Sequence, residues 1–436
     1  MRGMRYRAIN AELFEQHREN LKKHMLANSL AVLNANDILP TNADGSLPLR
    51  QNSDLFYLSG VDQEETILLL YPDAHEENMR EILFVRETSD LLATWEGHKL
   101  TKEEATRISG IQRVEWLSEF RPLLHRLMCE CNHVYLNANE HKRAVIEVET
   151  REARFVRDLI GRYPLHDYRR LAPILHRLRA VKSEGEVELM RRACEITRDA
   201  FRRVCRFVNP GVNEMEVEAE FAHEFVRNGA GFAYTPIIAS GPNACVLHYI
   251  QNDQACRKGD LLLLDVGASY ANYNADMTRT IPVNGKFTRR QKDVYKAVLR
   301  VMRGTMKAAL PGKLPRQWQK DAEALMQEEL LSLGLLTHAE VRRQDPLKPA
   351  LKKYFMHGVG HPLGLDVHDV GITTEPIQAG WVLTVEPGIY IREEGLAVRL
   401  ENNIVVGETG NVDLMADIPV EAKDVEDLMK HRSTLR

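Results

Sequence analysis

The sequence predicts an α/β protein of two domains, an N-terminal α/β domain over residues 1–175 and a C-terminal α+β domain over residues 176–436. The chain has 436 residues, and this length exceeds the roughly 100–200 residues of an ordinary domain. Its first half alternates apolar, strand-like runs with stretches of helical period. Its second half alternates long helical stretches with paired strand-like segments that suit antiparallel hairpins.

The N-terminal half begins with a predicted helix, because Phe14, Leu21 and Met25 recur on one helical face at i, i+7 and i+11. Apolar runs separated by polar turns then predict four strands. These strands cover residues 29–34, 55–58, 66–71 and 82–85. Two further helical stretches follow, near residues 117–130 and 144–162.

A break in the helical pattern near residues 163–183 predicts the boundary between the halves. Ser183 and Glu186 directly after it have the spacing of a capping box, which starts a helix. This helix ends before the Asn-Pro-Gly segment at 209–211. It places four residues on one face, namely Val187, Met190, Cys194 and Phe201.

Composition restricts the function classes. Lys and Arg number 58 and Asp and Glu number 62, so the near-balanced charge gives no reason to expect nucleic acid or a membrane surface as a partner. No run of 18 apolar residues predicts a transmembrane helix, and the first residues lack the apolar core of a secretory signal. The six scattered cysteines are typical of a reducing compartment, and we expect a cytoplasmic protein.

Two segments of the second half share one plan. Residues 261–267 and 381–388 are each an apolar strand that ends in an acid, Asp265 or Glu386, with a glycine two residues later. A second acid, Asp276 or Glu401, follows 11 or 15 residues after the first. These spacings suit two antiparallel hairpins with one acid on each strand, although chance similarity between two buried strands explains the plan equally well.

The four acids indicate a metal centre. A carboxylate that ends an apolar strand is costly to bury unless it is paired, hydrogen-bonded or bound to metal. Several carboxylates in one cavity repel each other without cations, whereas two divalent ions about 3.5–4 Å apart neutralise them and create a bridging hydroxide. Oxygen ligands with a single imidazole suit Mn²⁺. One such acid alone is more often a satisfied structural carboxylate, but two pairs together favour the metal.

The segment 357–369, HGVGHPLGLDVHD, contains three histidines and three glycines in 13 residues. Glycines let the backbone approach a site closely, and histidine serves both as a metal ligand and as a proton-transfer group near neutral pH. The alternative is a set of unrelated histidines, which leaves the glycines without a purpose in ordinary helix or strand.

Four motifs together resemble the pita-bread metallopeptidases, specifically aminopeptidase P (Xaa-Pro aminopeptidase) and its relative prolidase. They are LLLLDVGASYANYNADMTRT at 261–280, the histidine segment at 357–369, LTVEPGIY at 383–390 and VRLENN at 398–403. The resemblance covers nearly the whole chain. It implies an N-terminal domain of the aminopeptidase P and creatinase type, followed by a pita-bread α+β catalytic domain. It also implies five metal ligands: Asp265, Asp276, His361, Glu386 and Glu401.

The resemblance assigns a role to each ligand. Asp276 and Glu401 bridge two metal ions, Asp265 chelates one ion, and His361 with Glu386 holds the other. The implied reaction is hydrolysis of the bond before proline, at the N-terminus of a peptide, by a hydroxide that bridges the metals.

Other residues match the family's substrate side and its ligand support. His248 matches a substrate-side histidine, and His368 matches one that stabilises the tetrahedral intermediate or shuttles protons. Arg399 matches an arginine that orients a ligand carboxylate, a support expected around metals. Glu386 handles the proton of the nucleophile in addition to its metal role.

The sequence departs from the family pattern at three positions next to the matched residues, namely Asn402, Asn403 and Pro362. Asn402 and Asn403 follow Glu401 where the family often has acids, which lowers the local negative charge. Pro362 follows His361 where relatives often carry an aromatic residue, which bears on the shape of the substrate pocket. Trp95 loosely matches a tryptophan that reaches a neighbouring subunit's active site, and an ordinary packing tryptophan is an equal alternative. We expect a homodimer or homotetramer.

Three alternatives share this fold. Prolidase has the same metal site but takes only dipeptides, and length selectivity depends on how the N-terminal domain walls the cleft. Creatinase lacks the intact metal set, and scaffold proteins of this fold have lost ligands. Because all five ligand residues are present, we predict an enzyme that acts on peptides with proline at the second position.

Overall fold

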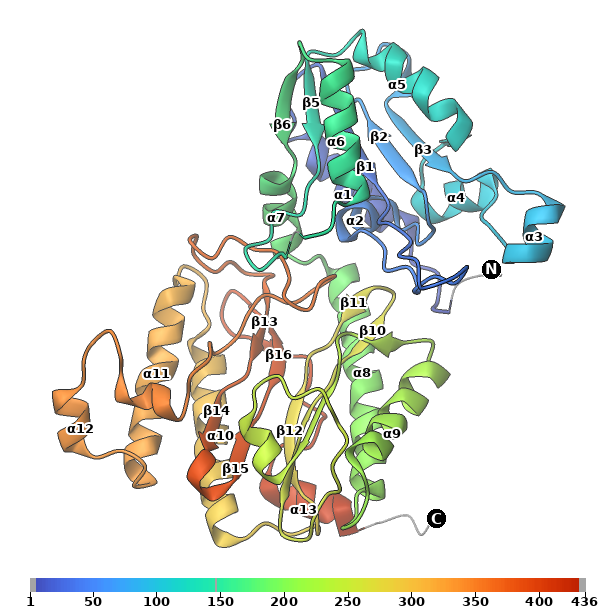
Figure 1. The fold of residues 1–436 in the computed structure, drawn as a ribbon. Coiled ribbons are helices and arrows are strands. Elements are labelled where there is room, and N and C mark those ends of the chain that lie inside the picture. The colour runs from blue at the N-terminus through green and yellow to red at the C-terminus, as the bar shows by residue number, and fades with distance from the viewer. Residues whose placement is uncertain (1–4, 146, 431–436) are drawn as a thin grey trace. The chain divides into compact units, whose positions relative to one another are not determined.

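The computed structural model describes residues 5–145 and 147–430, and the first residues, on which the expected lack of a secretory signal rests, lie partly outside this range. The chain divides into two compact units, Met1–Arg179 and Ala180–Arg436. Figure 1 shows a sheet with helices in the first unit and short strands with long helices in the second. Among the described residues, no helix is long and apolar enough to cross a membrane.

The N-terminal unit contains a six-stranded mixed sheet of order β4-β3-β2-β1-β5-β6. The strands are β1 (Ser29–Asn34), β2 (Ile67–Leu70), β3 (Glu81–Val85), β4 (Arg113–Trp116), β5 (His133–Leu136) and β6 (Asp167–Arg170). The helices are α1 (Ala11–Lys22), α2 (Ser53–Ser59), α3 (Asp90–Glu96), α4 (Lys102–Ser109), α5 (Phe120–Met128), α6 (Arg151–Arg162) and α7 (Ala172–Ala180). Three of the four predicted strands are confirmed.

The fourth predicted strand, residues 55–58, is wrong, since these residues lie in α2. The Asn52 side chain accepts hydrogen bonds from the backbone of Asp54 and Leu55 and starts the helix, and Gly60 ends it at φ 66°. Residues 55–59 are all buried, so their apolar run shows no period that separates helix from strand.

Two predicted helices are shorter than expected. The helix predicted at 144–162 begins only at Arg151, because the Thr150 side chain accepts a hydrogen bond from Ala153 N and caps it there; residue 146 lies outside the described residues. Helix α1 buries Phe14 and Leu21 but ends at Lys22, before Met25.

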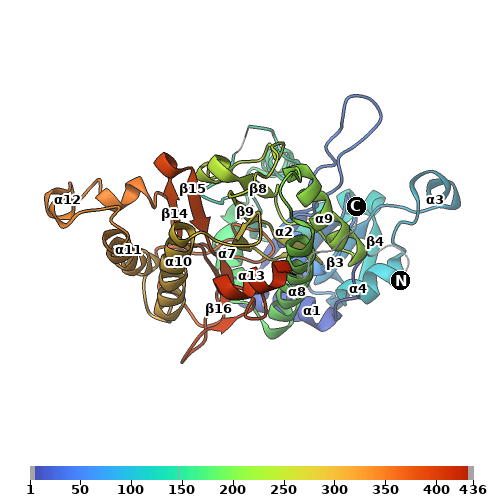
Figure 2. The same ribbon diagram turned by 90° about the horizontal axis from the view of Figure 1, so that it is seen from below.

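The C-terminal unit surrounds short strands with helices. The helices are α8 (Glu184–Phe207), α9 (Glu214–Arg227), α10 (Arg289–Ala308), α11 (Pro315–Ser332), α12 (His338–Arg343) and α13 (Ala422–Lys430). Figures 1 and 2 show α8 and α9 on one side of the strands and α10 and α11 on the other. The predicted capping box of Ser183 and Glu186 starts α8. Met190, Cys194 and Phe201 are buried, and Val187 is half-buried.

The strands of this unit repeat one plan twice. The strands are β7 (Gly231–Phe232), β8 (Ile237–Ser240), β9 (Leu261–Asp265), β10 (Ala268–Tyr270), β11 (Tyr273–Asn274), β12 (Thr278–Pro282), β13 (Val382–Val385), β14 (Gly388–Ile391), β15 (Leu396–Arg399), β16 (Asn402–Val405) and β17 (Val412–Asp413). An outer antiparallel pair, β9 with β12 or β13 with β16, encloses an inner antiparallel pair, β10 with β11 or β14 with β15.

The predicted hairpins are therefore confirmed, and the acids occupy matching places in them. Asp265 ends β9 opposite Thr278, and Asp276 lies two residues before β12. Glu386 directly follows β13, and Glu401 directly precedes β16. In each repeat, both acids therefore lie at the junctions between the outer strand pair and the inner strand pair.

Candidate metal centre

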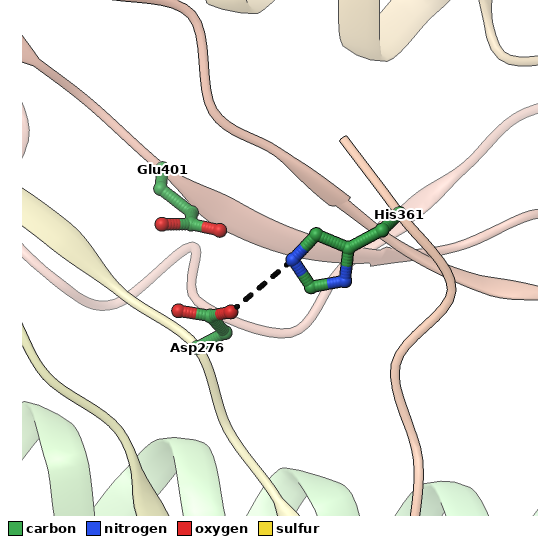
Figure 3. Close-up of side chains that lie close together, drawn as sticks. All are labelled: Asp276, His361 and Glu401. Carbon is green, nitrogen blue, oxygen red and sulfur yellow. Dashed lines mark ion pairs between the residues drawn. The ribbon is translucent and has the colours of Figure 1, made fainter. Parts of the chain in front are cut away.

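Three of the predicted ligands meet in one place. Asp276, His361 and Glu401 each offer a ligand atom, and these atoms all lie within 4.8 Å of one another. Figure 3 shows the two carboxylates facing the imidazole. His361 Nε2 lies 3.5 Å from Asp276 Oδ2. The two acids come from different hairpins and the histidine from the glycine-rich segment, so the centre joins residues that are far apart in sequence.

The other two predicted ligands flank this group. Glu386 Oε1 lies 3.7 Å from His361 Nε2. On the opposite side, the Tyr234 hydroxyl lies 2.6 Å from both Asp265 Oδ1 and Asp276 Oδ1 and links these carboxylates. All five residues that the motifs singled out therefore surround a single centre.

The charges of this centre are unbalanced. Burial raises the pKa of Asp265 although Arg399 lowers it. Burial and the neighbouring acids raise the pKa of Glu386 to about 7 and raise that of Glu401 well above its ordinary value. Burial lowers the pKa of His361, but the carboxylates beside it outweigh this effect and raise its pKa. The raised pKa values mean that these groups hold protons tightly, because the centre lacks the positive charge that a bound cation would supply.

The donor atoms fit a divalent cation. Glu401 Oε2 accepts a hydrogen bond of 2.7 Å from the Thr278 hydroxyl, but the buried Oε1 has no hydrogen-bond partner among the described residues. His361 Nδ1 lies 2.9 Å from the Pro362 carbonyl oxygen, and donation to it leaves Nε2 with a free lone pair. Four carboxylates and one imidazole are the ligand types of a hard divalent ion.

Arg399 connects the two repeats beneath the centre. Its Nη2 donates to Asp265 Oδ2 at 2.5 Å, and its Nε donates at 3.1 Å to the same Thr278 hydroxyl that binds Glu401. Its Nη1 donates to the Tyr390 hydroxyl at 2.8 Å. One guanidinium thus orients an acid from each hairpin.

The two asparagines that depart from the family pattern support the backbone. Asn403 accepts a hydrogen bond from Asp276 N at 3.0 Å and donates one to Asp276 O at 2.6 Å, so it fixes the peptide of that acid. Asn402 accepts from Arg279 and donates to Asp413, both at 2.7 Å. Both side-chain amides form hydrogen bonds that support the residues around the centre. The lack of charge at these two positions therefore takes no proposed ligand away from the centre.

The two predicted substrate-side histidines are exposed. The ring of His368 packs edge-on against His361 with centroids 4.3 Å apart, so the structure brings it to the centre. His248 lies in the turn after a 3₁₀ segment, Gly241–Cys245.

Two groups at this site, His357 and Tyr234, lie outside the residues to which the sequence assigned a role. His357 Nε2 lies 2.8 Å from the Tyr390 hydroxyl that binds Arg399, and burial, followed by the Arg399 charge, lowers its pKa to about 3. Its place at the start of the histidine segment was a usable signal. Tyr234 bridges two acids but lies in a loop without a motif, so no sequence signal indicated it.

A glycine in the histidine segment allows the approach to the acids. A Cβ on Gly360 would lie 2.0 Å from the Thr384 carbonyl oxygen and 2.9 Å from Trp318. Thr384 belongs to β13, and its hydroxyl accepts a hydrogen bond from His361 N at 3.0 Å. Close packing of segment and strand therefore sets the position of the imidazole.

An oxygen-rich centre for divalent cations, enclosed by paired hairpins and helices, defines a class of metal-dependent hydrolases, because such ions activate water. The chain belongs to metallopeptidase family M24: the model of that family matches residues 188–408, and the model of the aminopeptidase P N-terminal domain matches residues 14–135.

The chain is similar along its length to aminopeptidases. It is 34% identical to the Xaa-Pro aminopeptidase of Escherichia coli over 97% of this chain and 98% of that protein. It is 31% identical to human Xaa-Pro aminopeptidase 3 over 88% of this chain and 77% of that protein. A solved structure of aminopeptidase P from E. coli with the inhibitor Pro-Leu superimposes with a TM-score of 0.86 at 34% identity, covering 97% and 99% of the two chains.

These matches confirm the predicted resemblance, the two-part fold and the enzyme class. The protein is a metalloaminopeptidase of the M24 family and uses divalent metal ions. The prolidase alternative has less support, since the relatives described above are aminopeptidases.

Proposed function

We propose that the protein removes the first residue from peptides whose second residue is proline, with two divalent ions, most suitably Mn²⁺, bound by Asp265, Asp276, His361, Glu386 and Glu401. The observation that carries this proposal is the buried, unpartnered Oε1 of Glu401 within an excess of carboxylates. A buried oxygen without a donor is costly unless a cation reaches it.

The geometry supports separate roles for the ligands. Asp276 directs Oδ1 toward Tyr234 and, through it, Asp265, whereas its Oδ2 faces His361. A carboxylate whose two oxygens face two ligand groups suits a bridge between two ions. We assign Glu401 as the second bridge, Asp265 to one ion, and His361 with Glu386 to the other.

The bound ions would lower the pKa of a water held between them and polarise the scissile carbonyl. Glu386, whose carboxylate lies 3.7 Å from His361 Nε2, would take and return the proton of that water. His368, whose ring contacts His361, would donate a hydrogen bond to the tetrahedral intermediate. His248 and His357 would line the proline side, and Arg399 holds Asp265 in place.

The predicted assembly and compartment also remain proposals. Trp95 is 82% exposed and Leu91 70% exposed on the short helix α3, and this apolar surface supports a homodimer or homotetramer. All six cysteines are free thiols, which supports the reducing cytoplasm as the site of action.

The test compares substrates of two lengths on Mn²⁺-loaded protein. We expect an Xaa-Pro-Yaa tripeptide to be cleaved with higher kcat/KM than the matching Xaa-Pro dipeptide, because contacts beyond proline supply binding energy that is usable in the transition state. Xaa-Ala-Yaa is the control for proline selectivity. Cleavage of the dipeptide alone would identify a prolidase, and equal cleavage of the Ala peptide would contradict the proline assignment.

A further inference from the structure

A buried ion pair lies directly behind the histidine segment. Lys182 Nζ lies 2.9 Å from Asp369 Oδ2, and both side chains are only 1% exposed. Asp369 is the residue after His368, whereas Lys182 lies 187 positions earlier, just before α8. The proposed function assigns no role to either residue.

The pair closes the histidine segment into a compact loop. Asp369 N donates to Pro362 O at 2.9 Å, so the loop returns on itself between His361 and His368. A Cβ on Gly364 would lie 2.2 Å from Asp369 Oδ2 and 2.9 Å from Lys182 Cε. The ion pair thus packs directly against the Gly364 backbone, where a residue with a side chain would not fit.

Lys182 is also tied to the second acid hairpin. Its backbone N–H donates to Gly380 O at 2.8 Å, and Val181 forms a β-bridge with Trp381. Trp381 leads into β13 and hence to Glu386. A movement of Lys182 would therefore disturb both the histidine loop and this strand.

The first acid hairpin holds the other side of the loop. Asn274, two residues before Asp276, donates from its backbone N to Gly364 O at 3.0 Å and from Nδ2 to Gly364 O and Leu365 O, both at 2.9 Å. The loop that carries both histidines is therefore fixed between the two hairpins that carry the acids.

Burial of two charges carries a large desolvation cost, and their attraction offsets this cost only with good geometry. An apolar pair of similar volume would often be as stable, so stability alone does not explain the pair. We propose that Lys182 and Asp369 are positioning residues of the reaction, which hold His368 at the distance from His361 that its transition-state role requires. This inference rests on the proposed role of His368.

The test uses Lys182→Met and Asp369→Asn in the Mn²⁺-loaded protein, with kcat, KM and metal content measured on an Xaa-Pro-Yaa peptide. We expect kcat to fall roughly 10- to 100-fold, since small displacements of a catalytic group have effects of this size, while KM stays within about twofold and both metals remain. The double variant should recover part of kcat, because it leaves no unpaired buried charge.

The decisive comparison adds His368→Ala. If the pair acts through His368, Lys182→Met should cause no further loss of kcat in the His368→Ala protein. An equal loss in both backgrounds, or wild-type kcat in the single variants, would overturn the proposal. Glu81→Gln is the control, since it removes the carboxylate that forms an ion pair with the buried Arg18 in the N-terminal unit and should change stability but not kcat.

Two further outcomes are separable. If Lys182→Met and Asp369→Asn do not fold, Gly364→Ala displaces the intact pair by steric contact and should lower kcat in the same way; an unchanged kcat in folded Gly364→Ala protein would contradict the proposal. Failure of the wild-type protein to cleave any Xaa-Pro peptide would instead contradict the proposed function itself.

Discussion

Two glutamates of the C-terminal unit, Glu214 and Glu401, are buried to the same degree but have opposite surroundings. Glu214 is 0% exposed and Glu401 is 1% exposed. Glu214 Oε1 accepts hydrogen bonds from Ser240 N at 2.7 Å and Oγ at 2.6 Å, and its Oε2 accepts from Tyr249 Oη at 2.7 Å and Gln254 N at 3.0 Å. Both of its oxygens are therefore satisfied by the protein.

The Glu401 carboxylate accepts one hydrogen bond among the described residues, from Thr278, and faces Asp276 instead of further donors. Burial and the neighbouring acids raise its pKa well above the ordinary value. The difference teaches that burial of an acid does not by itself indicate a metal site. A metal site is indicated where a buried carboxylate has more acceptor oxygens than the protein supplies hydrogen-bond donors for.

Metal removal should separate the two regions most strongly. We expect the Mn²⁺-loaded protein to bind two ions per chain and to lose activity by at least roughly 10³-fold on chelation, because the ions supply both the activated water and the polarised carbonyl. The hydrogen-bonded surroundings of Glu214 should be unaffected. Elemental analysis and turnover before and after chelation provide the measurement. A stoichiometry near zero with unchanged turnover would refute the metal assignment.

Replacement of His361, the single imidazole among the proposed ligands, should have the next largest effect. His361→Ala leaves one ion under-coordinated, so we expect kcat to fall by at least roughly 10²-fold, with a lower metal content. Phe287→Leu, a buried substitution outside the centre, is a control for general perturbation of the unit. Near wild-type turnover in His361→Ala protein would show that this residue is not a ligand.

Paired glutamine substitutions compare the two glutamates directly. In Glu214→Gln, an amide NH₂ group would face hydrogen-bond donors where a carboxylate oxygen now accepts. We therefore expect the free energy of unfolding to fall by about 1–3 kcal/mol with metal content unchanged. Glu401→Gln puts a neutral amide where burial and the neighbouring acids already disfavour a charge, so it should leave metal-free protein equally or more stable while reducing metal binding. Denaturant unfolding and metal analysis of both variants provide the test. A stability loss in metal-free Glu401→Gln as large as in Glu214→Gln would contradict the distinction.

A third buried acid sharpens the comparison with a smaller effect. Glu152 in the N-terminal unit accepts from Asn34 N at 2.8 Å and Asn34 Nδ2 at 2.9 Å, yet burial raises its pKa to about 7. The folded state therefore holds a proton more tightly than the unfolded chain, whose value is near 4.5. The bound proton stabilises the folded state fully below pH 4.5, and this stabilisation is lost as the pH rises through 7.

We expect the unfolding free energy of the wild type to fall by about 1 kcal/mol between pH 6 and pH 8 relative to Glu152→Gln, which cannot titrate. Urea unfolding of both metal-loaded proteins at several pH values measures this difference. Parallel pH profiles would mean that Glu152 is ionised throughout.

Near neighbours along the chain were enough to predict several elements and to single out the proposed ligands. The capping box of Ser183 and Glu186 spans one helical turn, and the acids at the ends of β9 and β13 are marked by the apolar strands that they interrupt. Local spacing sufficed for these because hairpins and caps bring together residues that are close along the chain.

Only the tertiary structure decided the rest. Residues 55–58 form a helix because Asn52 and Gly60 cap a run that is buried on all sides, and an apolar run of that kind has no period to read. Asn403 fixes the Asp276 peptide across 127 positions, and Lys182 reaches Asp369 across 187. Contacts at such separation leave no periodic signal in one sequence, because their partners are chosen by the packing of whole elements.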